Sequence, residues 1–82
     1  MNSAMRMLVA EILNCSPGAI TAMSGLGIDP RWDSIAQLNI MLALEERYGV
    51  EITDDTIRQF SRFDALEAFV VARGATAGHE PA

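Results

Sequence analysis

The sequence has no lysine, and its only cysteine and histidine are Cys15 and His79. All six basic residues are arginines, and eleven Asp and Glu residues give a formal net charge of −5. Because nucleic-acid phosphates bind positive surfaces, this acidic balance argues against a nucleic-acid partner. A single cysteine cannot form an internal disulfide, so nothing in the sequence requires an oxidising compartment.

Long apolar runs are also missing, although half of the residues are hydrophobic. No stretch approaches the roughly 20 apolar residues of a membrane-spanning helix. The first residues, MNSAMRMLVAEIL, are interrupted by Arg6 and Glu11, so we expect no signal peptide. A chain of 82 residues is one domain and is too short for a deep cleft beside its core. We therefore expect a globular, soluble, cytoplasmic protein.

Four helices and one long loop are predicted. Ser3 is a good N-cap for a first helix that ends near Leu13. A loop rich in Gly, Pro and Ser follows, and Ser16-Pro17 opens a short turn within it. The apolar side of the first helix is predicted to contain Met7, Leu8, Ile12 and Leu13.

The later helices are marked by their caps. Asp33 is a good N-cap for a second helix over 34–48, and Gly49 is a typical C-cap. Thr53 caps a short third helix, and Ser61 with Asp64 forms an imperfect capping box for the fourth. The fold class is all-α: a small four-helix bundle of three main helices and one short helix, with a long loop between helices 1 and 2. We expect the domain to cover residues 1–74 and a flexible tail to cover 75–82.

The second helix is apolar on nearly every side between Ser34 and Glu45. A helix of this kind is normally buried all round, but four short helices cannot cover it completely. An exposed apolar strip then indicates a contact surface. The predicted core joins Ile40, Leu44 and Tyr48 of this helix to Leu13, Ile57, Leu66 and Val70.

Ser34 is a lone hydroxyl at the start of this apolar helix, and its position has three interpretations. It can simply favour the helix terminus. A hydrolase nucleophile needs a base within reach, but the only histidine is His79 in the tail and lysine is absent. The third interpretation is a serine that another enzyme modifies, because a phosphodiester there would meet the free N–H groups of the helix start.

A family resemblance supports the third interpretation. It is carried by WDSIAQLNIMLALEERYGVEITDDTI and the later FDALEAFV, and it covers about residues 5–71. The chain resembles a discrete, single-domain acyl carrier protein. The family pattern is Asp-Ser-Leu/Ile opening an apolar helix, a Leu-Glu-Glu-like step, an aromatic residue and Gly or Asp, then a short turn and a final helix.

The resemblance implies that Ser34 receives 4′-phosphopantetheine from coenzyme A through a separate phosphopantetheinyl transferase. Asp33 would help the transferase and its Mg²⁺ to position the site. The thiol-ended arm would then hold an acyl group as a thioester, and the protein itself would catalyse nothing. Partner enzymes that transfer or modify acyl groups would bind a monomer through Ile35, Met41, Leu42, Glu45 and Glu46.

The sequence departs from the carriers of fatty-acid synthesis at three positions. Trp32 stands where those carriers have a small residue, and Ala36 and Asn39 stand where they often have carboxylates. These departures favour a dedicated carrier for one pathway, such as polyketide or specialised lipid synthesis. Two alternatives remain, a peptidyl or aminoacyl carrier and a helical module that binds partners without covalent modification. No metal site is expected, since capping explains Asp54 and Asp55 and the sequence lacks an EF-hand pattern.

Overall fold

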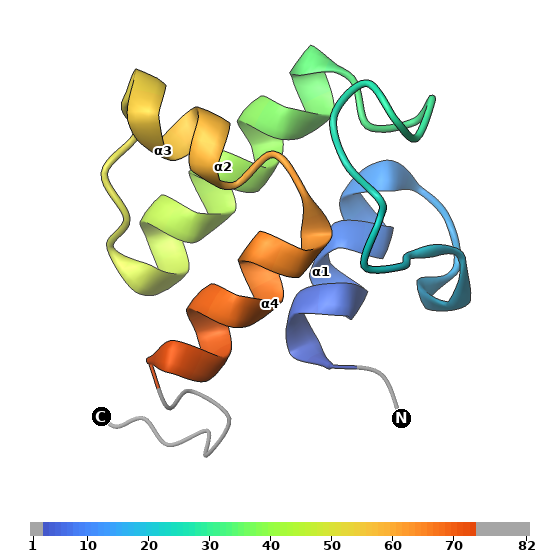
Figure 1. The fold of residues 1–82 in the computed structure, drawn as a ribbon, viewed down its shortest axis with the longest axis horizontal. Coiled ribbons are helices and arrows are strands. Elements are labelled where there is room, and N and C mark those ends of the chain that lie inside the picture. Colours follow the sequence, from blue (N-terminus) through green and yellow to red (C-terminus); the bar gives the residue numbers. More distant parts are fainter. Residues whose placement is uncertain (1–2, 74–82) are drawn as a thin grey trace.

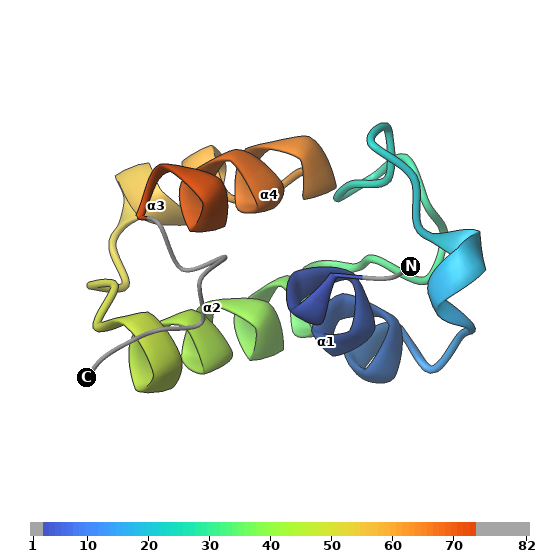
Figure 2. The ribbon, with the colours of Figure 1, turned by 90° about the horizontal axis from the view of Figure 1, so that it is seen from below.

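The helices of the protein pack in two layers. The computed structural model describes residues 3–73, with α1 over Ala4–Leu13, the 3₁₀ turn η1 over Pro17–Ala19, α2 over Ser34–Tyr48, α3 over Asp54–Gln59 and α4 over Phe63–Ala72 (Figure 1). Seen from below, α1 and α2 lie in one layer, and α3 and α4 lie in the other (Figure 2). This confirms the small all-α bundle of three main helices and one short helix, with a long loop after the first. The expected tail at 75–82 lies outside the described residues.

Side-chain caps set the predicted helix starts. The Ser3 hydroxyl accepts a hydrogen bond from the backbone N–H of Arg6 at 3.0 Å and opens α1. Thr53 and Thr56 form a reciprocal capping box at the start of α3. Gly49 ends α2 with φ 71°, a left-handed conformation that glycine adopts without strain. These starts and the end of α2 agree with the predictions from sequence.

The predicted cap of the fourth helix is wrong. α4 begins at Phe63, and its N-cap residue is Arg62, which makes no side-chain capping bond. The Ser61 hydroxyl instead donates to the carbonyl of Arg58 at 2.8 Å. The first N–H of α4, on Phe63, donates to the carbonyl of Ser24 in the long loop at 2.8 Å. A tertiary backbone bond therefore replaces the expected local cap.

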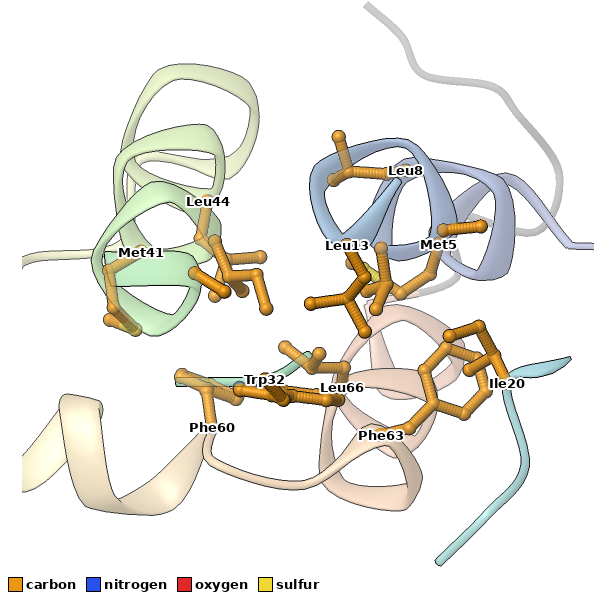
Figure 3. Close-up of a cluster of buried hydrophobic side chains, with 14 residues drawn as sticks. Met5, Leu8, Leu13, Ile20, Trp32, Met41, Leu44, Phe60, Phe63 and Leu66 are labelled. Carbon is orange, nitrogen blue, oxygen red and sulfur yellow. The ribbon is translucent and has the colours of Figure 1, made fainter. Parts of the chain in front are cut away.

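The core lies between the two layers. Leu13, Ile40, Leu44 and Leu66 are buried as predicted, whereas Tyr48, Ile57 and Val70 are half-buried against the core. Large buried side chains outside the predicted core set also belong to it: Met5, Ile20, Trp32, Phe60 and Phe63. In Figure 3, Trp32 and Leu66 lie in the middle of the cluster, between Phe60 and Phe63.

The buried face of α1 is displaced from the predicted one. Met7 is 55% exposed, so its place on the apolar side is a wrong prediction. The residues that face the core are Met5, Leu8, Val9, Ala10 and Leu13. Two adjacent apolar stripes satisfy the helical period on this segment, and packing against the rest of the bundle selects the one through Met5 and Val9.

Candidate functional site

The first turn of α2 combines an exposed hydroxyl with free backbone donors. Ser34 is the first residue of α2 and is exposed. Asp33 Oδ1 accepts from the backbone N–H of Ala36 at 2.9 Å, and the first bond of the helical ladder runs from Gln37 N to Asp33 O, also at 2.9 Å. The N–H groups of Ser34 and Ile35 precede that ladder and have no partner within the helix. Together with the helix dipole, they favour an anionic group on Ser34.

Two hollows open beside Ser34. One has a volume of about 360 Å³ and lies over the long loop. The other, about 240 Å³, lies between α2 and α3 and is called the α2–α3 hollow below. Leu26 and Ser34 border both. The α2–α3 hollow is lined by Leu26, Ser34, Gln37, Leu38, Met41 and Ile57.

The long loop is fixed to the α3–α4 turn, and this places Leu26 next to Ser34. Gly25 forms an isolated bridge with Arg62, and the N–H of Leu26 donates to the carbonyl of Ser61 at 2.8 Å. A Cβ atom on Gly25 would lie 2.7 Å from that Ser61 carbonyl oxygen, so only glycine allows this approach. The loop reaches the start of α2 in Figure 1 after passing the beginning of α4.

An ion pair orders the loop just before the site. Arg31 Nη2 lies 3.0 Å from Asp29 Oδ2, and Arg31 Nε and backbone N–H both donate to Asp29 Oδ1. These hydrogen bonds, together with the positive charge of Arg31, hold the pKa of the Asp29 carboxyl below its ordinary value. Asp29 is therefore ionised at neutral pH, and its charge is balanced by that of Arg31.

A buried polar network one turn into α2 was not predicted. Gln37 is 3% exposed, and its Oε1 accepts from the indole Nε1 of Trp32 at 2.6 Å. Its Nε2 donates to the carbonyls of Ile57 and Phe60, each at 3.0 Å. The network joins the loop, α2 and α3. A glutamine within a mostly apolar helix was the signal in the sequence, but its partners could not be predicted from the spacing of residues.

The surface of α2 confirms the expected exposed apolar strip, with one correction. Ile35 is 68% exposed and Leu42 is 46% exposed, and Glu45 and Glu46 are exposed as well. Met41 is fully buried, so its place in a docking surface is wrong. Leu38, at 48% exposure, belongs to the strip instead. Helical geometry explains the exchange, because Met41 lies one turn from Gln37 on the face that contacts α3.

Comparison with known protein families shows the family to which the chain belongs. A family model described as a phosphopantetheine attachment site matches residues 3–70, which include all four α-helices almost to the end of α4. The chain belongs to this family. Its members are non-catalytic carrier proteins that hold 4′-phosphopantetheine covalently and interact with phosphopantetheinyl transferases and pathway enzymes. No curated protein and no solved structure gives a significant match.

The residues at the start of α2 are suited to hold a covalently attached 4′-phosphopantetheine. An exposed hydroxyl is available for a phosphodiester, two free backbone N–H groups are available to its oxygens, and the two hollows described above border Ser34. Within residues 3–73, His, Cys, Asp and Glu form no cluster of three or more that could hold a metal ion. No helix in the same range is both long enough and apolar enough to cross a membrane.

Proposed function

We propose that Ser34 is the attachment residue for 4′-phosphopantetheine and that the protein carries acyl groups as thioesters for one dedicated biosynthetic pathway. Polyketide and specialised lipid synthesis are the classes that we favour. The observation that carries the proposal is the exposed Ser34 hydroxyl at the start of a 15-residue helix, inside the region that matches the family. The attached group supplies a terminal thiol, to which the acyl cargo is bound.

The surroundings of the other serines make them less suitable than Ser34 as attachment sites. The Ser3 hydroxyl is engaged with Arg6 and Glu67, and Ser24 is buried and accepts from Thr21. The Ser61 hydroxyl donates to a backbone carbonyl. Ser16 is exposed but precedes a 3₁₀ turn of only three residues. Ser34 alone combines exposure with a long helix whose first N–H groups are free.

Asp33 is proposed to act in the modification reaction through its second carboxylate oxygen. Oδ1 is engaged in the helix cap, and Asp33 is exposed. A carboxylate in this position can approach a Mg²⁺ ion held by the transferase, since hard cations prefer oxygen ligands. Cargo of the acyl class is favoured over an aminoacyl group because Leu26, Leu38, Met41 and Ile57 make the α2–α3 hollow mostly apolar. The proposal includes a monomer in the cytoplasm.

The test is an intact-mass measurement after incubation with coenzyme A and a phosphopantetheinyl transferase of broad specificity. We expect the wild-type protein to gain one phosphopantetheine and Ser34→Ala to gain none. Ser16→Ala is the matched control, because it removes an exposed serine hydroxyl elsewhere, and it should be modified like wild type. Modification of the Ser34→Ala protein would show that another residue is the attachment site.

A further inference from the structure

The α2–α3 hollow has an open mouth and a closed floor. Ser34 lies at its mouth with Leu26 and Leu38, both partly exposed. Its floor is formed by Met41, which is fully buried, and by Gln37. An apolar group tethered to Ser34 gains burial by entering this hollow, and the floor determines how far it can go.

Gln37 is held in place by three hydrogen bonds. Its carboxamide oxygen accepts from the Trp32 indole, and its nitrogen donates to the carbonyls of Ile57 and Phe60. Both N–H donors of the amide are therefore used. Trp32 is itself 1% exposed and fills the space between the two helix layers (Figure 3). Each side chain borders a hollow on one side, and on the other sides close-packed core residues oppose its movement.

On the side of the floor that Gln37 forms, a long acyl chain could enter the core only by displacing Gln37. That movement would leave the buried Trp32 N–H and Phe60 carbonyl, and the half-buried Ile57 carbonyl, without partners. An unsatisfied buried polar group costs more than the burial of one further methylene group gains. The two buried groups and the half-buried carbonyl together oppose deeper insertion, so a chain that has filled the hollow continues outward to solvent.

We propose that Gln37, fixed by Trp32, is the residue that limits the cargo of this carrier to short acyl groups. The proposal rests on the attachment of phosphopantetheine at Ser34. Gln37 is a specificity-determining residue in this role, and it acts on the apolar end of the cargo and not on the attachment reaction.

The test is a series of acyl groups of increasing length on the wild-type protein. Acetyl, butyryl, octanoyl and dodecanoyl forms are made from the corresponding acyl-coenzyme A with the transferase, and intact mass verifies each. The melting temperature of each form is compared with that of the phosphopantetheine form. A group that is buried only in the folded state raises it. We expect the melting temperature to increase with the length of the acyl group only while that group is short. For longer groups, up to dodecanoyl, it should stay constant.

Gln37→Ala tests the floor directly, because it removes the carboxamide and enlarges the hollow. In this variant we expect the rise to continue to the octanoyl and dodecanoyl forms. Asn39→Ala is the matched control, since Asn39 is an exposed amide on the same helix and does not line the hollow. It should reproduce the wild-type series.

Each other outcome contradicts the proposal in a distinct way. A wild-type melting temperature that keeps rising to dodecanoyl shows that Gln37 is no barrier, and one that never rises shows that cargo does not enter the hollow. If the Gln37→Ala protein folds and its acyl forms give the same series of melting temperatures as wild type, Gln37 does not limit the length of the cargo. If Gln37→Ala does not fold, the wild-type series still decides. Failure of the transferase to load Ser34 overturns the proposed attachment site and, with it, this inference.

Discussion

At the start of α2, adjacent residues have different tasks. Asp33 completes the helix by accepting the N–H of Ala36, and Ser34 presents a hydroxyl to solvent. Both roles depend on residues within one helical turn of each other, so they could be predicted from the sequence. Gln37 and Trp32 act through contacts with α3 and the loop. No spacing rule brings those partners together, and the network was therefore missed.

Asp29 makes the stability of the loop depend on pH. Its hydrogen bonds from Arg31 lower the folded-state pKa below the ordinary 3.8. The pair therefore stabilises the folded protein fully above that ordinary value, and the contribution is lost as the pH falls through the lower folded-state pKa. We expect Asp29→Asn to be less stable than wild type at neutral pH, with the difference shrinking in acid.

Urea unfolding of both proteins, at neutral pH and at the most acidic pH at which they still fold, measures this change. Arg31→Gln removes the other member of the same pair and should give the same pH profile. An Asp29→Asn penalty that is equally large at both pH values would mean that the ion pair is not its cause.

Between elements, the contact of the long loop with the α3–α4 turn explains which helix boundaries could be predicted. Gly49 and Thr53 determine their helix ends by local conformation and capping, and sequence was sufficient there. The start of α4 instead depends on Ser24, 39 positions from Phe63 in the chain, which receives the N–H of Phe63. Ser61 and Asp64 suggested a local capping box, but the start of α4 is instead bonded to the distant Ser24 carbonyl.

The same contact predicts opposite results for two glycines. In Gly25→Ala the new methyl group would lie 2.7 Å from the Ser61 carbonyl oxygen, so the backbone must shift. We expect a loss of about 1–3 kcal/mol, as for other overpacked positions. A Cβ on Gly18 would meet nothing within 4 Å, so Gly18→Ala should change stability by no more than about 0.5 kcal/mol.

Urea unfolding of the two variants measures this difference. Equal stabilities would show that the loop tolerates a side chain at position 25 and that its contact with the turn is not tight. Because the Leu26 N–H donates to the same Ser61 carbonyl that the new methyl group would crowd, amide hydrogen exchange of Leu26 should also increase in Gly25→Ala alone.

For the whole molecule, α2 serves the core on one side and the surface on the other. Leu44 is fully buried and Leu42 is 46% exposed. We expect Leu44→Ala to cost about 2–5 kcal/mol, as buried leucine truncations do, out of a total near 5–15 kcal/mol for a small protein. Leu42→Ala should cost about 0.5 kcal/mol or less. Thermal unfolding compares the two, and an unchanged melting temperature in Leu44→Ala would remove this face of α2 from the core.

The exposed side of α2 predicts how partner enzymes bind. Ile35, Leu38 and Leu42 are exposed apolar residues along the helix, and Glu45 and Glu46 follow them near its end. Between Asp33 and Glu45 the helix carries no charged residue, so electrostatic attraction is concentrated at its far end. We expect the apolar residues to supply most of the binding free energy, and the glutamates mainly to increase the association rate, an effect that salt screens.

Binding of the transferase to wild type, Leu42→Ala and Glu45→Gln, measured at low and high salt, separates the two contributions. Leu42→Ala should weaken binding at both salt concentrations, because burial of an apolar side chain does not depend on screening. Glu45→Gln should slow association at low salt and have little effect at high salt, since exposed charges separated by more than about 8–10 Å are largely screened near physiological ionic strength. The stability of the free Leu42→Ala protein, measured as above, is the control for unfolding. A larger loss for Glu45→Gln than for Leu42→Ala at high salt would show that charge, and not the apolar strip, holds the partner.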